Sequence, residues 1–327
     1  MTFVVIGYGS IGRRHVNNLR ALGIQSVVVE PNIMRQNEAR KNSCEVFSSI
    51  ESVQMRTEFR AVVICSPPKF HIEHLNWALA NGKKVFLEKP IAMSLEECKS
   101  VRLEHHENIF VGYTYRWNEQ FLQLKEIVEQ GSIGKPFFAR FTIGANLEDW
   151  HPWEDYRDFF MSKSFLGGGA LLDESHFLEL AIELFGIPDQ VVGRQSKISN
   201  LEIDSDDYVF AQLRYQDLLV DIHLDLFSRP HKSMLEISGS LGSVICDLIS
   251  KVNQLTISKS YANFETELYK FEYERNDVFS KMTQDFTIFV DSKDSNARVP
   301  FSRGLEVMSL IEKIRDKSKN NFWIAND

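Results

Sequence analysis

The chain has 327 residues, more than one hydrophobic core usually organises, so we expect two domains. Hydrophobic residues make up 43% of the sequence and charged residues 25%, as in globular proteins. The net charge of −8 at pH 7 argues against a nucleic-acid partner, because surfaces that follow a phosphate backbone gather Lys and Arg.

The four cysteines lie far apart without a CxxC pair, which predicts reduced thiols and no zinc site. The sequence opens directly with an apolar run at residues 2–6, which leaves no room for a charged leader segment. No apolar run approaches the roughly 20 residues that span a bilayer. We therefore expect a cytoplasmic protein with no membrane partner and no bound metal.

In the first third of the chain, short β-rich apolar runs alternate with amphipathic stretches. This alternation is typical of βαβ units and of a buried parallel sheet. The expected strands cover residues 3–6, 26–30, 61–65, 84–87 and 109–112. The expected helices cover residues 11–22, 33–41, 70–80 and 95–105.

The turn after the first expected strand has a GxGxxG pattern formed by Gly7, Tyr8, Gly9, Ser10, Ile11 and Gly12. The first glycine permits a tight turn, the second lets the backbone approach a pyrophosphate, and the third lets the helix pack on the strand. The N-terminus of the following helix supplies free N–H groups and a positive dipole. All six residues are expected to bind a dinucleotide; the alternative is a structural glycine-rich turn.

Glu30 ends the second expected strand, about 20 residues after the glycine turn. Its carboxylate can accept hydrogen bonds from the adenosine ribose and would repel a 2′-phosphate, which favours NAD over NADP. Arg35 keeps NADP open as the less favoured cofactor. The alternative for Glu30 is a solvated carboxylate beside Pro31.

Two further motifs follow the expected strands at residues 61–65 and 84–87, namely SPPKFH at residues 66–71 and EKP at residues 88–90. With GYGSIGRRH, GKKVFLEKP and the later GGGALLDESH, they resemble the Gfo/Idh/MocA family of oxidoreductases over nearly the whole chain. The resemblance implies an NAD-dependent dehydrogenase that acts on CH–OH groups. It implies cofactor contacts from Ser66, Pro67, His71, Glu88 and Lys89.

Lys89 follows a parallel strand at its carboxyl end, where ligands bind in doubly wound sheets. Its ammonium group can polarise a substrate oxygen, or accept a proton if desolvation lowers its pKa. The alternative is an exposed lysine beside a turn; the resemblance implies that Lys89 is catalytic. His71 and His74 could share a metal on one helix face, but no third ligand is indicated, and we expect His74 at the surface.

Beyond Tyr113 the pattern changes to a helix at residues 119–129, a strand at residues 137–143 and an aromatic, polar loop at residues 146–157. Aromatic faces with adjacent hydrogen-bonding groups suit sugar rings, although such a loop can equally fold into a small core of its own. The candidate substrate-binding residues are Arg116, Trp150, His151, Tyr156 and Arg157. The two arginines could bind an anionic group, which indicates a nucleotide sugar or a sugar acid.

Three glycines at residues 167–169 precede a helical pattern that runs to about Phe185. Asp173 and His176 lie three residues apart and would share a helix face, so the carboxylate could orient the imidazole as a general base. The resemblance implies a catalytic role for His176. Family members usually place this Asp and His four positions apart, which leaves the role of Asp173 open; the alternative for His176 is a buried, satisfied ring.

From residue 190 to about residue 271 the sequence is strand-like, and residues 220–226 alternate between apolar and polar. This pattern predicts an antiparallel sheet with one open face, through which the resemblance implies assembly into a homodimer or homotetramer. Two helices at residues 277–290 and 303–317 close the chain. The resemblance implies that they pack back on the first domain, so we expect domains at residues 1–116 with 277–327, and at 117–276.

The sequence therefore predicts an α/β protein with an N-terminal Rossmann domain, a doubly wound parallel sheet. A C-terminal α+β domain with a large, mostly antiparallel open sheet follows it. The predicted reaction is hydride transfer between NAD and a hydroxyl or keto carbon of a sugar, polyol or nucleotide sugar. The alternatives are an inositol or aldose dehydrogenase, and a non-catalytic NAD-binding sensor of the same fold.

Overall fold

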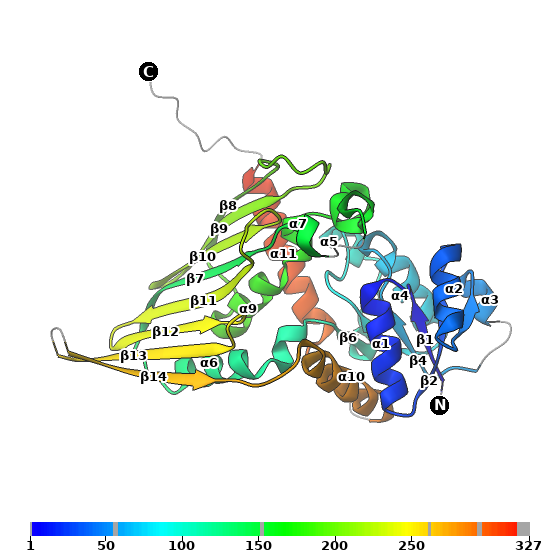
Figure 1. The fold of residues 1–327 in the computed structure, drawn as a ribbon, viewed down its shortest axis with the longest axis horizontal. Helices are drawn as coiled ribbons and strands as arrows, with labels where there is room; N and C mark the ends of the chain where they lie inside the picture. The colour runs from blue at the N-terminus through cyan, green and yellow to red at the C-terminus, as the bar shows by residue number, and fades with distance from the viewer. Residues whose placement is uncertain (1, 55–57, 151–153, 261–262, 293–295, 319–327) are drawn as a thin grey trace, which may run out of the picture. The chain divides into compact units, whose positions relative to one another are not determined.

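The computed structural model describes residues 2–54, 58–150, 154–260, 263–292 and 296–318. The chain divides into two units, which are described separately (Figure 1). Unit 1 comprises Met1–Trp117 and Glu274–Met308, and unit 2 comprises Asn118–Tyr273 and Ser309–Asp327.

Unit 1 contains a six-stranded sheet in the order β3-β2-β1-β4-β5-β6, with every neighbouring pair parallel. The strands are β1 Thr2–Ile6, β2 Gln25–Val29, β3 Glu45–Phe47, β4 Ala61–Ile64, β5 Lys84–Leu87 and β6 Ile109–Val111. This is the strand order of a doubly wound dinucleotide-binding sheet, whose switch point lies between β1 and β4. The expected parallel sheet is confirmed.

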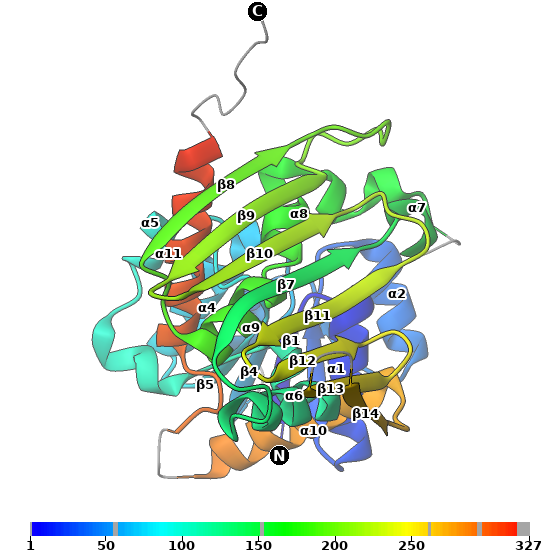
Figure 2. The same ribbon diagram turned by 90° about the vertical axis from the view of Figure 1, so that its left-hand side faces the viewer.

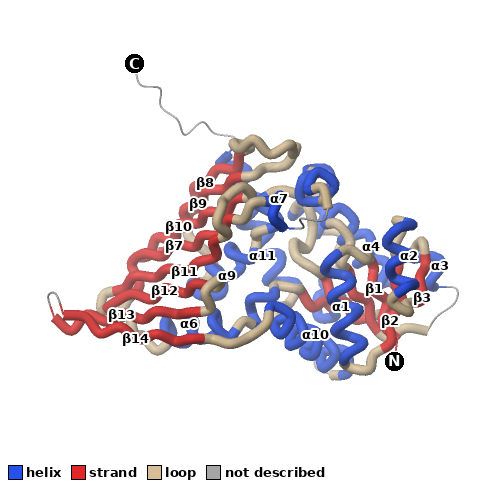
Figure 3. Tube along the Cα trace, in the orientation of Figure 1, coloured by secondary structure: helices blue, strands red, loops and turns tan. Residues whose placement is uncertain are grey.

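Helices and 3₁₀ turns connect or follow these strands, and α10 joins them from near the end of the chain (Figure 3). They are α1 Ser10–Ala21, α2 Ile33–Lys41, α3 Ile50–Gln54, α4 His71–Ala80, α5 Leu95–Cys98 and α10 Arg275–Asp291, with 3₁₀ turns η1 Pro68–Phe70, η2 Leu103–Asn108 and η3 Thr114–Trp117. The helix expected at residues 95–105 is wrong, because α5 ends at Cys98 and the next turn buries Val101. Tertiary packing here overrides helix propensity.

An aromatic core fixes α10 to the sheet of unit 1. Phe286 of α10 lies with its ring centroid 5.8 Å from that of Phe3, 5.4 Å from Phe86 and 5.7 Å from Phe110. Such edge-to-face pairs add about 0.5–1.5 kcal/mol each beyond the burial of their area. A helix from the last sixth of the chain is therefore part of the first unit's core.

Unit 2 contains an eight-stranded sheet in the order β14-β13-β12-β11-β7-β10-β9-β8. The pair β7–β10 is parallel and the other pairs are antiparallel. The strands are β7 Pro136–Gly144, β8 Gln190–Ser196, β9 Tyr208–Tyr215, β10 Leu218–Asp225, β11 Lys232–Gly239, β12 Gly242–Asp247, β13 Val252–Ser260 and β14 Asn263–Lys270. The expected mostly antiparallel sheet is confirmed.

One face of this sheet packs against helices α6, α8 and α9. The helices and 3₁₀ turns of the unit are α6 Glu119–Glu129, α7 Leu147–Trp150, η4 Tyr156–Asp158, η5 Phe160–Ser162, η6 Ser164–Leu166, α8 Ala170–Asp173, α9 His176–Phe185 and the end of α11 Phe301–Ser318. No described element of unit 2 covers the opposite, outer face (Figure 2). Along β10, buried Val220, Ile222 and Leu224 accordingly alternate with more exposed residues.

Among the described residues, no helix combines the length and the apolar character that crossing a membrane requires.

Candidate active site

The glycine turn after β1 requires glycine at two of its positions. Gly7 has φ +95°, and a Cβ there would lie 2.7 Å from the Cys65 carbonyl oxygen. A Cβ on Gly12 would lie 2.0 Å from the carbonyl oxygen of Gly7. A Cβ on Gly9 would meet no atom within 4 Å, so the surface of the turn is open at that position.

The open position lies at the N-terminus of α1. Gly9 is the N-cap residue of this helix, with no side-chain capping bond, and no acidic residue lies in the first turn. The exposed Ser10 and half-buried Ile11 follow it. Free amide groups, the positive end of the dipole and a site without a Cβ together fit a diphosphate group.

Glu30 connects the end of β2 to the glycine turn. Its side chain accepts hydrogen bonds from the backbone N–H of Tyr8 at 2.7 Å and of Asn32 at 2.9 Å, and the residue is 3% exposed. A carboxylate has about four acceptor sites, so these bonds leave capacity for ribose hydroxyls. Tyr8 is itself buried and its hydroxyl accepts from Asn42, so its backbone rather than its ring faces the turn. Arg35 is exposed on α2.

The loop after β4 is held by two histidines of the next helix. His71 is 1% exposed, with Nε2 2.7 Å from the Ser66 carbonyl oxygen and Nδ1 2.7 Å from that of Pro90. His74 Nδ1 lies 2.9 Å from the Ser66 hydroxyl. Pro67 lies half-buried between these residues. The expectation of a surface His74 is wrong, because its half-buried ring is bonded to this loop.

Burial sets the protonation of both rings. It lowers the pKa of His71 to about 4, against the opposing effects of the two carbonyl groups and of Glu88. It also lowers the pKa of His74. The two rings have separate partners, and no group of three His, Cys, Asp or Glu side chains suited to a metal occurs in the described part of the chain.

The EKP motif begins directly after β5. Glu88 is 7% exposed, and its Oε1 lies 2.8 Å from Nε2 of His15 in α1. Its Oε2 accepts the backbone N–H of Lys89 at 3.3 Å. Lys89 is half-buried and its bond to Pro90 is cis. Sequence reasoning missed His15, although a histidine three residues after the last glycine, on the buried side of α1, was a signal.

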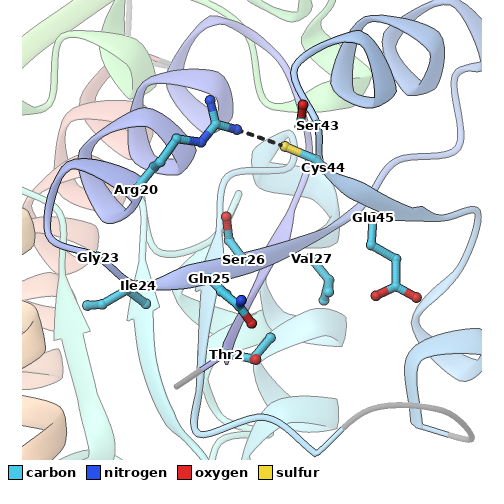
Figure 4. Close-up of a pocket in the computed structure, with 10 residues that line it drawn as sticks. All are labelled: Thr2, Arg20, Gly23, Ile24, Gln25, Ser26, Val27, Ser43, Cys44 and Glu45. Atoms are coloured by element: carbon cyan, nitrogen blue, oxygen red, sulfur yellow. Dashed lines mark hydrogen bonds between the residues drawn. The ribbon is translucent and has the colours of Figure 1, made fainter.

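The carboxyl ends of parallel strands meet at one edge of a sheet, where ligands bind in doubly wound sheets. The predicted cofactor residues that lie there are Gly7, Tyr8, Gly9, Ser10, Ile11, Gly12, Glu30, Ser66, Pro67, His71, Glu88 and Lys89. A cavity of about 430 Å³ lies at the other edge, between the starts of β1, β2 and β3, and is lined by Thr2, Ser26 and Glu45 among others (Figure 4). Its place at the amino ends separates it from the predicted cofactor residues.

In unit 2, an aspartate not predicted from the sequence organises the three-glycine segment. Asp206 accepts the backbone N–H of Leu171 at 2.9 Å, and its carbonyl accepts that of Ala170. Gly169 has φ +116°, and a Cβ there would lie 2.2 Å from Asp206 Oδ1. Burial raises the pKa of Asp206 to about 6. The carboxyl group therefore caps α8 at some electrostatic cost near neutral pH.

The continuous helix expected from the glycines to Phe185 is wrong. Asp173 closes α8 and His176 opens α9, with a turn at Glu174 and Ser175 between them. The shared helix face expected for Asp173 and His176 is therefore replaced by a bend. Asp173 is 5% exposed and His176 is half-buried.

Described residues of the aromatic loop form hydrogen bonds and ion pairs with other residues of unit 2. Trp150 is half-buried at the end of α7, and His151 lies outside the described residues. The Tyr156 hydroxyl accepts the backbone N–H of Glu202 at 3.2 Å. Arg157, which was expected to bind an anionic group, is ion-paired with Asp155 at 2.9 Å and with Glu202 at 2.7 Å.

Arg116 lies half-buried in η3 of unit 1, whereas the other four candidates for substrate binding belong to unit 2.

The strand order and the glycine turn define unit 1 as a dinucleotide-binding Rossmann domain. Two family models match the chain: an oxidoreductase family with an NAD-binding Rossmann fold over residues 1–112, and the Gfo/Idh/MocA C-terminal domain over residues 121–245. The chain therefore belongs to the Gfo/Idh/MocA family of oxidoreductases. The first match confirms NAD as the expected cofactor.

Curated relatives are 27–30% identical to the chain over 42–56% of its length. An inositol 2-dehydrogenase of Klebsiella pneumoniae (strain 342) is 30% identical over 146 residues, 42% of this chain and 43% of that protein. A 2,7-anhydro-N-acetylneuraminate hydratase of Mediterraneibacter gnavus is 27% identical over 192 residues, 56% of this chain and 49% of that protein. The chain thus spans about half the length of these relatives.

Solved structures match the fold over 98% of the chain. A levoglucosan dehydrogenase in complex with NADH has a TM-score of 0.84 and 20% identity, and the match covers 98% of this chain and 97% of that one. An Agrobacterium radiobacter oxidoreductase with NAD⁺, L-tartaric acid and magnesium has a TM-score of 0.81 and 15% identity, covering 98% and 96%. At such identities the likeness shows the fold.

Proposed function

We propose that this chain transfers a hydride between NAD and a hydroxyl or keto carbon of a sugar or polyol. The observation that carries the proposal is the position of Lys89 at the carboxyl edge of the parallel sheet, the edge that also bears the open turn at Gly9. The names of an inositol 2-dehydrogenase relative and of a levoglucosan dehydrogenase neighbour support this substrate class.

The residues at this edge fit a dinucleotide. The N-terminus of α1 and the open surface at Gly9 would receive the diphosphate, and Glu30 would accept the adenosine ribose hydroxyls. The nicotinamide half would be bordered by Ser66, Pro67, His71, Glu88 and Lys89. When bound, NAD supplies the acceptor or donor of the hydride.

Lys89 is the proposed group that holds the reacting oxygen. Its ammonium stabilises negative charge that develops on this oxygen, and a positioned proton donor or acceptor contributes about 10²–10⁴-fold to a rate. His176 is the proposed base for the hydroxyl proton. A catalytic role is also proposed for the buried Asp173, which ends the preceding helix α8. Substrate contacts are proposed for Arg116, Trp150, His151, Tyr156 and Arg157.

Substitution of Lys89 by Met tests the function. We expect turnover, followed at 340 nm with a panel of polyols, aldoses and sugar acids, to fall about 10²–10⁴-fold. The affinity for NADH, measured by fluorescence titration, should stay within about threefold. Lys99→Met is the matched control, because that side chain is 70% exposed on α5's C-terminal side and should leave both quantities unchanged.

Unchanged turnover in Lys89→Met would exclude Lys89 from the chemistry. Binding of NADH without turnover of any substrate by the unaltered chain would instead favour a cofactor-binding sensor.

Glu30→Gln tests the cofactor assignment. The single amide oxygen can still accept the backbone N–H of Tyr8, whereas the bond from the Asn32 N–H to the second oxygen is lost together with the charge that repels a 2′-phosphate. We expect the affinity ratio of NADPH to NADH to rise about tenfold, which corresponds to 1.4 kcal/mol. An unaltered ratio would refute the role of Glu30 in cofactor discrimination.

We infer that copies of the chain associate through the outer face of the unit 2 sheet, as a dimer or tetramer in the cytoplasm. Strand pairing places exposed apolar side chains on this face at Val192, Phe210, Leu219, Phe264 and Leu268. Sedimentation equilibrium of Leu219→Arg, compared with the unaltered chain, tests the inference: a monomer supports it, and an unchanged mass overturns it.

A further inference from the structure

Two buried histidines contact the residues on either side of Lys89. His15 Nε2 lies 2.8 Å from Glu88 Oε1, and His71 Nδ1 lies 2.7 Å from the Pro90 carbonyl oxygen. Each histidine is 1% exposed. Lys89 therefore stands between two anchored neighbours, while its own side chain is half-buried.

The anchors come from different parts of the carboxyl edge of the sheet. His15 belongs to α1, the helix whose N-terminus carries the glycine turn, and its ring packs 4.7 Å from the ring of Phe86 and 6.5 Å from that of Phe279. His71 opens α4 and its second nitrogen lies 2.7 Å from the Ser66 carbonyl oxygen. The EKP segment is thus tied to α1, the helix of the proposed diphosphate site, and it contacts His71, whose neutral ring donates its one N–H to either the Ser66 or the Pro90 carbonyl oxygen.

Packing alone does not explain these contacts. Burying a carboxylate such as Glu88 is costly unless it is paired, and an apolar residue of similar volume could be buried at lower cost. A paired polar group in a core instead fixes one arrangement of the chain. Here the arrangement that is fixed is that of the backbone on both sides of Lys89.

We propose that His15 and His71 are positioning residues that set the place of Lys89, acting through Glu88 and Pro90. The proposal rests on the proposed function for the role of Lys89, but the anchoring itself can be measured without turnover. Neither histidine needs to touch the substrate, since each acts on the backbone that carries the lysine.

The first experiment uses hydrogen–deuterium exchange of the full chain without ligands. In His15→Leu, we expect the amides of residues 88–92 to exchange about tenfold faster than in the unaltered chain, because the tie to α1 is lost. In His15→Gln, whose amide nitrogen can donate to Glu88, exchange should return toward the original rate. Val16→Ala is the matched control, because it removes apolar contacts of the same helix at a fully buried position and keeps the contact between His15 and Glu88.

The same three variants are then assayed for NADH binding and turnover. We expect kcat to fall about 10–100-fold in His15→Leu, with the dissociation constant for NADH within about threefold and recovery in His15→Gln. His71→Leu should act in the same direction, and His71→Asn, with a donor near the Nδ1 position, should recover part of the loss.

Unchanged exchange at residues 88–92 in His15→Leu, or equal acceleration in Val16→Ala, would overturn the anchoring. Faster exchange with unchanged kcat would overturn the positioning role. If the unaltered chain turns over no substrate, the proposed function fails, and the exchange rates still decide whether the histidines hold this segment.

Discussion

The buried ring of His71 makes the stability of unit 1 depend on pH in a defined direction. Burial lowers its pKa from 6.5 to about 4, so between these values the unfolded chain binds a proton that the folded chain does not. The contribution of the neutral His71 ring to the free energy of unfolding is therefore complete above pH 6.5 and is lost as the pH falls toward 4. A shift of about 2.5 pH units at 1.36 kcal/mol per unit gives about 3 kcal/mol, of which about 2 kcal/mol is lost by pH 5.

The measurement compares urea unfolding of the unaltered chain and of His71→Gln at pH 7.5 and pH 5. Between pH 7.5 and pH 5, the free energy of unfolding of the unaltered chain should fall by about 2 kcal/mol more than that of His71→Gln, because the other titrating groups are common to both proteins. Histidine labelled with ¹³C at Cε1 gives the ring's pKa directly. The chain has nine histidines, so the resonance absent from His71→Gln identifies the ring.

A titration midpoint for His71 at or above 6, or equal losses in the two proteins, would refute the argument that burial outweighs the two carbonyl contacts.

The remaining predictions concern the glycine turn and the cap of α8. Gly9→Ala should leave the free energy of unfolding within about 0.5 kcal/mol, since its Cβ meets no atom within 4 Å, yet lower NADH affinity more than about tenfold in a fluorescence titration. Gly12→Ala should lower both the free energy of unfolding and the affinity for NADH, because its Cβ would lie 2.0 Å from the Gly7 carbonyl oxygen. Equal changes in the free energy of unfolding for the two variants would contradict this reasoning. Burial raises the pKa of Asp206 to about 6, so its stabilising protonated form is lost as the pH rises through 6. Asp206→Asn should therefore unfold at a higher temperature than the unaltered chain at pH 8 but not at pH 4. If the variant unfolds at a lower temperature than the unaltered chain at pH 8, the cost assigned to the ionised Asp206 carboxylate is contradicted.

Local patterns were sufficient to predict the parallel sheet and the position of Lys89. The glycine turn after β1 could be predicted because its conformation is set by residues within one short segment. The place of EKP after β5 could be predicted because the apolar run before it is a buried strand. The closing helices α10 and α11 also follow from their own periodicity. β3 was missed because its three residues are too few to establish a period.

What could not be predicted depends on residues far apart in the sequence. His15 and Glu88 are separated by 73 positions, and nothing local to either residue indicates the other. Asp206 caps α8 from 35 positions beyond Leu171. The ion pairs of Arg157 and the bend before His176 likewise depend on tertiary neighbours. The bend explains why the expected continuous helix is wrong.

The parallel pairing of β7 with β10 has a consequence for how the chain folds during synthesis. β7 is the first strand of its sheet to leave the ribosome, yet both its neighbours, β10 and β11, begin more than 70 residues later. Loop-closure entropy makes such distant pairing late and slow. The strand at the middle of the sheet therefore waits longest for its partners, so exposure of β7 in the nascent chain is the stage most open to aggregation.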